Sequence, residues 1–276
     1  MTILNEKGEI LSLRLISKFI FLIFLPNFVF TEGIQGLAEE NFGERFYGVY
    51  LGEFKLGYVI HKVSQTEHTV IQDFSMNIRM ALSEEEQTQH KAKYAFSQII
   101  SRYQFDKKNG LLNEMTEADG KKYYADYDSL LKSNHFKREI STLTAKYKGD
   151  FSYEVLTNNK AEERSKLLKL PKLHMNDYFA EINFILSNPE IGETRSIEVF
   201  DLDFEKEVFL GATLTLKQKE RGLEGNYEYV IQEDLGDETF TYTVDRYGNI
   251  IGAEIFGLNL ILEPKEQAIT LDAKNI

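Results

Sequence analysis

Apolar and polar residues alternate along most of the chain, and this is the period of a half-buried β-strand. Residues 70–80 show the alternation clearly, because Phe74, Met76, Ile78 and Met80 follow one another at every second position. Other strand-like segments occupy residues 45–51, 55–63, 88–106, 142–157, 194–204, 206–221, 226–234 and 237–262. The pattern predicts a mainly β fold made of successive antiparallel hairpins.

Short turn signals separate these segments. Gly52-Glu53 suits a two-residue hairpin turn of type II′, which takes glycine at its first central position. The charged residues 83–87 and the residues 107–110 are predicted as turns. Further hairpin tips are expected at Asp119-Gly120, Gly149-Asp150 and Tyr247–Asn249. The regular spacing of strands and turns is typical of a β meander.

One stretch departs from this rhythm. Asn176-Asp177 is a good start for a helix, and the following Pro189 is a good stop. Apolar residues lie at helical spacing between them, at Tyr178, Ile182, Ile185 and Leu186. We therefore predict one amphipathic helix over Asn176–Ser187, packed on a curved antiparallel sheet or half-barrel.

The N-terminus predicts export. Residues 19–30 are apolar except for Pro26 and Asn27, and Arg14 and Lys18 precede them. Twelve residues are too few for a helix that crosses a bilayer, which needs about 20. We interpret residues 1–36 as a signal peptide, with an uncleaved membrane anchor as the alternative. A linker over 37–45, a single mainly β domain over 46–265 and a flexible tail over 266–276 are expected to follow.

Composition is compatible with an extracytoplasmic location, periplasmic or secreted. The chain of 276 residues contains no cysteine, so disulfides, zinc sites built on thiolates and cysteine nucleophiles are excluded. Its net charge is -12, and no run of Lys and Arg forms the basic face that a nucleic-acid partner requires. The acidic balance is interpreted as a source of solubility.

The motifs give no positive sign of catalysis. No helix follows the glycines at 48, 52 and 57, so they do not form a phosphate loop. The five histidines show no metal-ligand spacing, and no G-x-S-x-G motif is present. Acidic clusters at 84–86, 201–205 and 233–237 are interpreted as solvated strand faces and turns, and the one at 201–205 lacks the glycine and distal glutamate of a calcium loop. No cofactor, metal site or catalytic residue is predicted, although a carboxylate pair assembled by the fold stays open.

The hairpin YGVYLGEFKLGYVIHKV at residues 47–63 resembles the first hairpin in the N-terminal β region of exported bacterial transglutaminase-like proteins. Residues 167–186, 190–201 and 241–255 fit the order of later elements of that region. In the family, a catalytic Cys, His and Asp belong to a papain-like domain that follows it. This chain has no cysteine and has Phe46-Tyr47 where a tryptophan is common. The resemblance therefore implies an accessory domain with no catalytic residue carried over.

More distantly, the pattern resembles the half-barrels of periplasmic lipoprotein carriers, in which a sheet wraps a helix around an apolar concavity. We predict a non-enzymatic protein that binds an envelope protein or an apolar ligand, with membrane contact only through an uncleaved N-terminus. The residues expected to line the ligand site are Phe179, Phe184, Ile185, Phe256 and Leu258, with an ordinary core as the alternative. A carboxylate-dependent hydrolase on the concave face and a purely structural envelope component are the rival functions.

Overall fold

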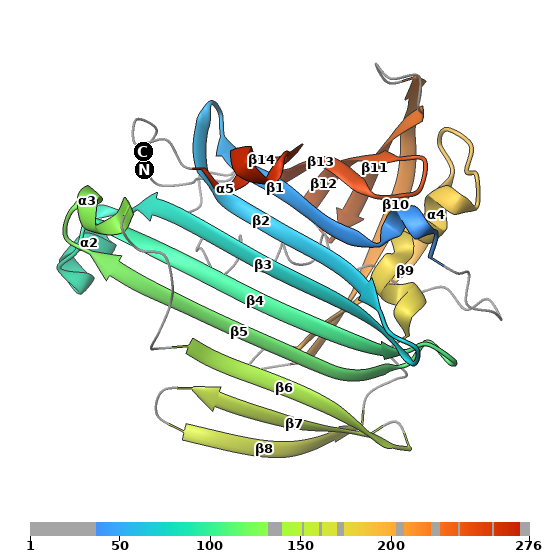
Figure 1. Ribbon diagram of the computed structural model, residues 1–276, viewed down its shortest axis with the longest axis horizontal. Helices are drawn as coiled ribbons and strands as arrows, with labels where there is room; N and C mark the ends of the chain where they lie inside the picture. Colours follow the sequence, from blue (N-terminus) through green and yellow to red (C-terminus); the bar gives the residue numbers. More distant parts are fainter. Residues whose placement is uncertain are drawn as a thin grey trace.

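The computed structural model (Figure 1) describes residues 37–131, 140–150, 152–159, 162–169, 174–202, 207–221, 227–236, 238–255 and 257–270. The first strands are β1 (Gly43–Leu51), β2 (Phe54–Gln65), β3 (Thr69–Ala81), β4 (Tyr94–Asp106), β5 (Leu112–Tyr124), β6 (Ile140–Gly149), β7 (Ser152–Asn159) and β8 (Glu162–Lys169). The later strands are β9 (Thr194–Leu202), β10 (Glu207–Arg221), β11 (Tyr227–Leu235), β12 (Glu238–Asp245), β13 (Ile250–Ile255) and β14 (Leu258–Glu263). The helices are η1 (Glu39–Asn41), α2 (Glu84–His90), α3 (Tyr127–Leu131), η2 (Met175–Phe179), α4 (Ala180–Leu186) and α5 (Lys265–Ile269).

All the described strands belong to one antiparallel sheet, which confirms the predicted fold class. Its order is β8-β7-β6-β5-β4-β3-β2-β1-β14-β13-β12-β11-β10-β9, so neighbours along the chain are mostly neighbours in the sheet. The first and last strands of the domain meet where β1 pairs with β14, from Phe46 opposite Glu263 to Leu51 opposite Leu258. The sheet is not closed, because β8 and β9 form its two edges.

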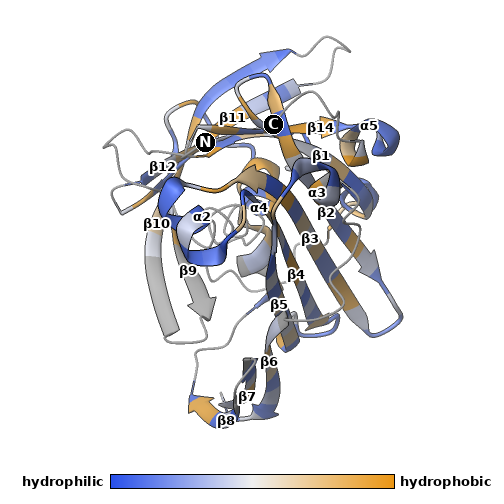
Figure 2. Ribbon diagram, turned by 90° about the vertical axis from the view of Figure 1, so that its left-hand side faces the viewer, coloured by the Kyte–Doolittle hydropathy of each residue, from blue (hydrophilic) through white to orange (hydrophobic). Residues whose placement is uncertain are grey.

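The sheet curves so strongly that it forms two facing walls, with α4 between them (Figure 2). The strands β2 to β5 make one wall, and β9 to β12 make the other. Alternate residues of both walls point inward and form one continuous core. Phe74 and Met76 of β3 belong to it, as do Ile231 of β11 and Phe240 of β12. The alternation of the sequence thus places the core on the concave face.

Most of the predicted turns are confirmed. Gly52 has a φ of +59° between β1 and β2, as a glycine at the first central position of a tight hairpin turn requires. Residues 107–110 connect β4 to β5, and Gly149-Asp150 lies between β6 and β7. The Tyr247–Asn249 turn joins β12 to β13. A second reversal around Gly257 adds β14, which the sequence pattern had merged with β13.

The hairpin tip predicted at Asp119-Gly120 is wrong. Gly120 lies inside β5, opposite Gln98 of β4 and Ile140 of β6. Aspartate-glycine favours a turn only where the chain is free to reverse. Here two long neighbouring strands offer the backbone a continuous ladder, and this pairing prevails over the local preference.

Residues 83–87, predicted as a charged turn, begin the helix α2 instead. The Ser83 side chain accepts a hydrogen bond from the Glu86 amide, and the Glu86 carboxylate accepts one from the Ser83 amide. This reciprocal capping box satisfies two helix-end donors. The helix is held further by the Lys121–Glu86 ion pair and by the stacking of His90 on Tyr123.

Because α2 has no buried residue, we expect its stability to depend strongly on the capping box at Ser83. We expect Ser83→Ala to destabilise α2 by about 1 kcal/mol, since alanine offers no acceptor to the Glu86 amide. Amide hydrogen exchange of residues 84–90 measures this change. Thr88→Ala is the control, because Thr88 lies inside the helix and makes no cap. Equal exchange in the wild type and Ser83→Ala would contradict the capping role.

The segment after β14 is helical where the sequence predicts a loose tail. Residues 265–269, most of which were expected to belong to a flexible tail, form α5, and Ala268 is fully buried there. The remaining tail residues, 271–276, and the predicted signal peptide, 1–36, lie outside the described residues. Within the described part of the chain, no helix has the length and apolar character needed to cross a membrane.

Candidate functional site

The predicted amphipathic helix is present as two short pieces, η2 and α4, which lie on the concave face. The ring of Tyr178 packs against Tyr103 and Phe105 of β4, with ring centroids 5.1 and 5.0 Å apart. On the other side, Ile182 lies against Gly248 in the turn between β12 and β13. The η2–α4 segment therefore joins the two walls of the sheet.

Four of the five residues predicted to line a ligand site are described, and all four lie in the core. Phe179, Phe184, Ile185 and Leu258 are all buried in the main core. Of these four, Phe179 lines a small cavity, whereas the other three are not among its lining residues. Phe256 lies outside the described residues.

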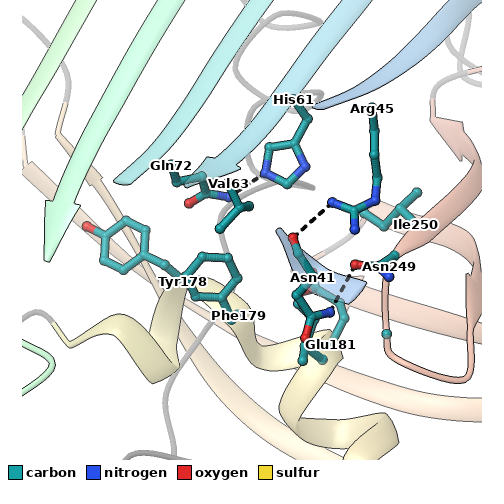
Figure 3. Close-up of a pocket in the computed structure, with 12 residues that line it drawn as sticks. Asn41, Arg45, His61, Val63, Gln72, Tyr178, Phe179, Glu181, Asn249 and Ile250 are labelled. Atoms are coloured by element: carbon teal, nitrogen blue, oxygen red, sulfur yellow. Dashed lines mark hydrogen bonds between the residues drawn. The ribbon is translucent and has the colours of Figure 1, made fainter. Parts of the chain in front are cut away.

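The cavity lies between η1, the strands β1 to β3, α4 and the β12–β13 turn (Figure 3). Its volume is about 30 Å³, which is enough for one or two water molecules. Polar and apolar side chains share its wall. The lining residues are Asn41, Arg45, His61, Val63, Gln72, Tyr178, Phe179, Glu181, Ile182, Gly248, Asn249 and Ile250.

Hydrogen bonds connect the residues on one side of the cavity. Arg45 Nη1 donates to the Asn41 carbonyl at 3.1 Å, and Asn41 Nδ2 donates to Asn249 Oδ1 at 2.9 Å. Asn249 in turn donates to a carboxylate oxygen of Asp245 at 2.9 Å. Through these contacts the segment that precedes β1 is fastened to the β12–β13 turn.

His61 and Gln72 form the opposite side of the cavity. Their side-chain nitrogens, Nε2 in both residues, lie 3.0 Å apart, as the dashed line in Figure 3 shows. Burial, together with the positive charge of Arg45, lowers the pKa of His61 far below its ordinary value. His61 is therefore neutral near pH 7, and Arg45 is the cation of the cavity wall.

Two buried carboxyl groups give the site its most unusual chemistry. Glu181, in the first turn of α4, is 5% exposed, and Glu233 of β11 is 2% exposed. Burial and the negative charge of Glu233 raise the pKa of Glu181 to about 8. Burial also raises the pKa of Glu233 to about 7, although a hydrogen bond from Tyr242 opposes this shift. Near pH 7 the pair holds protons that exposed glutamates would have lost.

Glu181 differs from Glu233 in its partners. Glu233 accepts a hydrogen bond from the Tyr242 hydroxyl. Within the described part of the chain, no other side chain forms a hydrogen bond with the Glu181 carboxyl group, which borders the cavity, and a hydrogen bond from its own backbone amide only partly opposes the rise of its pKa. A buried ionised carboxylate without a partner side chain is disfavoured, so Glu181 is mostly protonated near pH 7.

Sequence reasoning missed Glu181, although a signal was present. Glu181 is the acidic residue within the run Tyr178–Leu186, on the same helical face as Tyr178, Ile182 and Ile185. An acid on an apolar face is expected to be buried, partnered or functional. Glu233 was noted only as part of an acidic cluster. No group of three or more His, Asp or Glu that would suit a metal ion occurs among the described residues.

Gly248 allows α4 to approach the turn closely. A Cβ atom at this position would lie 2.3 Å from the Ile182 Cα, and the φ of Gly248 is +79°. We expect Gly248→Ala to destabilise the protein by about 1–3 kcal/mol, because the turn and the helix backbone must separate. Urea unfolding measures the change.

Gly257→Ala is the matched control for this substitution. Gly257 has a similar φ of +74°, but nothing lies within 4 Å of its added Cβ. The Gly257→Ala variant therefore has the strain of alanine at a positive φ but no steric contact with a neighbouring backbone. An equal loss of stability in both variants would show that the contact with α4 is unimportant.

A scan of protein-family models and searches of curated proteins and solved structures found no match to this chain.

Proposed function

We propose that this protein is a non-catalytic, extracytoplasmic binding protein of the bacterial envelope. Its binding surface is the concave face of the sheet, and its ligand is an apolar molecule or an apolar segment of a partner protein. One observation carries the proposal: the sheet is open, and the short η2–α4 segment packs into an apolar core that extends over both walls. An open curved sheet of this kind offers an apolar concavity wherever that segment is displaced.

The cavity beside Glu181 is too small to hold an organic ligand while η2–α4 is in place. Pockets for organic ligands are typically on the order of 300–1,000 Å³, whereas the cavity beside Glu181 measures about 30 Å³. An acyl chain or an aromatic ligand therefore needs η2–α4 to move. The resemblance of residues 47–63 to the N-terminal β region of transglutaminase-like proteins supports an accessory role in the same compartment.

Native mass spectrometry of the protein purified from its own envelope tests this function. Solvent extraction of the same sample would identify what is released. We expect an added mass that disappears on extraction and returns when the extracted molecule is supplied again. A bare protein mass, with no uptake of phospholipid, free fatty acid or envelope peptides on incubation, would contradict the proposal.

The carboxyl pair favours a second candidate, an enzyme that uses Glu181 and Glu233 in acid–base catalysis. Glu181, with a pKa of about 8, borders a water-sized cavity and interacts with Glu233, whose pKa is about 7, and such values suit proton transfer at neutral pH. A hydrolytic activity on glycosides would support this function if Glu181→Gln and Glu233→Gln each abolished it. Activity that survives in both variants would exclude the pair as its source.

A further inference from the structure

The η2–α4 segment covers the proposed binding surface, and it carries one buried acid, Glu181. Phe179 and Phe184 of the segment insert into the core, and Ile182 reaches the opposite wall at Gly248. Glu181 lies among these apolar anchors, bordering the cavity. Any charge on Glu181 therefore lies between the helix and the sheet that it covers.

We propose that η2–α4 is a proton-dependent cover of the concave face, which stays seated while Glu181 and Glu233 are protonated and opens when they ionise. This inference rests on the proposed function, because it concerns access to the same binding surface. The ligand class is an apolar molecule with an acyl chain or aromatic rings, which the exposed core side chains would contact.

The groups that face Glu181 give little compensation for a charge. From β11 and β12 it meets Glu233, which repels it, and Tyr242, whose hydroxyl already donates to Glu233. From β1 and β2, Arg45 donates to main-chain carbonyl groups, and His61 is neutral. From β9, Arg195 lies over the ring of Phe184 and donates to Ser187.

The sign of the response follows from these contacts. The seated segment favours the protonated acids, so protons are bound more tightly in the covered state than in the open state. By linkage, raising the pH from 4.5, the ordinary glutamate pKa, to about 8 shifts the population toward the open state, and the shift levels off at higher pH. Each pKa unit by which the covered state exceeds the open state changes the opening equilibrium about tenfold.

Hydrogen exchange combined with probe binding tests the cover on the full chain. Exchange of the amides of residues 180–186 would be followed from pH 5.5 to pH 9 and corrected for the intrinsic rate. Binding of the apolar dye N-phenyl-1-naphthylamine would be measured at the same pH values. The variants are Glu181→Gln, which mimics the protonated acid, and Glu190→Gln as the control, because Glu190 is exposed beyond the end of α4.

We expect the corrected exchange in α4 to rise at least tenfold between pH 6 and pH 9 in the wild type and the control, with a parallel gain in dye binding. Glu181→Gln should show a much smaller rise, and strands β2 to β4 should stay protected throughout. The same rise in Glu181→Gln as in the wild type would overturn the proposal. Loss of protection in β2 to β4 together with α4 would also overturn it, because the whole domain would then be unfolding.

The two readouts separate the cover from the proposed function. Opening of α4 without any dye or ligand binding would support the cover and contradict the binding function. Dye binding at every pH, with no change in the exchange of α4, would support an apolar binding surface and overturn the cover.

Discussion

Replacing Glu181 by glutamine is expected to stabilise the protein at pH 8.5 by about 3–5 kcal/mol and to leave its stability at pH 4 nearly unchanged. The pKa of the buried acid is raised from 4.5 to about 8, and each unit of such a shift corresponds to about 1.4 kcal/mol. Glutamine has almost the same shape as the protonated acid and carries no charge. The substitution therefore removes the cost of holding an ionisable group in the core.

The direction of the pH dependence is set by which state binds the proton. Below pH 4.5 the carboxyl group is protonated in both states and has no differential effect. Between pH 4.5 and about 8 the unfolded chain loses this proton while the folded protein keeps it, so the free energy of unfolding falls as the pH rises. Glu233, with a pKa of about 7, adds to the same fall. The protein should accordingly be more stable at pH 5 than at pH 8.5.

Urea unfolding at half-unit steps from pH 4 to pH 9 measures both curves. The Glu181→Gln curve should coincide with that of the wild type at low pH and separate from it progressively above pH 5. Glu190→Gln removes an exposed carboxylate close to the same helix and should follow the wild type at every pH. Parallel curves for Glu181→Gln and the wild type would show that Glu181 titrates normally in the folded protein.

Substitution of Lys55 by methionine is expected to have the second large effect, a loss of about 3–5 kcal/mol. Lys55 Nζ lies 2.6 Å from Glu263 Oε2, and both side chains are buried. The same ammonium group donates to the Gln267 carbonyl at 2.6 Å, and the Tyr50 hydroxyl donates to Glu263. Removing the lysine leaves a buried carboxylate without its cation, which is far more costly than the pair itself. Because Gln267 belongs to α5, this helix should detach first.

Chemical denaturation and hydrogen exchange of residues 265–269 measure the loss. Lys62→Met is the matched control, because Lys62 also lies on β2 but pairs at 3.1 Å with Glu44 of β1, and 44% and 43% of the two side chains are exposed. Such a pair contributes roughly 0–1 kcal/mol. The double variant Lys55→Met/Glu263→Met should recover most of the stability, since it leaves no unpaired charge. A Lys55→Met variant as stable as Lys62→Met would show that the buried pair is dispensable.

Local rules in the sequence account for much of the fold. The two-residue period predicted strands such as β3, and glycine predicted the turn at Gly52, because one residue at a positive φ suffices to reverse a tight hairpin. The helical spacing around Ile182 and Ile185 located η2–α4. Each of these features depends on residues a few positions apart, and the sequence displays them directly.

The candidate site depends on contacts that no local pattern contains. Arg45 and His61 come from the first hairpin, Glu181 from the middle of the chain, and Glu233 from a strand of the opposite wall. The buried ion pair between Lys55 and Glu263 joins residues 208 positions apart. Strand pairing likewise decided that Asp119-Gly120 continues β5, since the ladders on both sides outweigh the turn preference of two residues.

The sequence by itself determined the alternation of strands, most of their turns and the position of the helix, because steric limits on the backbone and the burial of apolar faces act over a few neighbouring residues. The tertiary structure alone decided how strongly the sheet curves, that α4 lies between its walls, and that Glu181 meets Glu233 there. A carboxyl group has an ordinary pKa in any extended chain. Only its removal from water next to a second acid, which the curvature of the sheet brings about, makes it hold its proton near neutral pH.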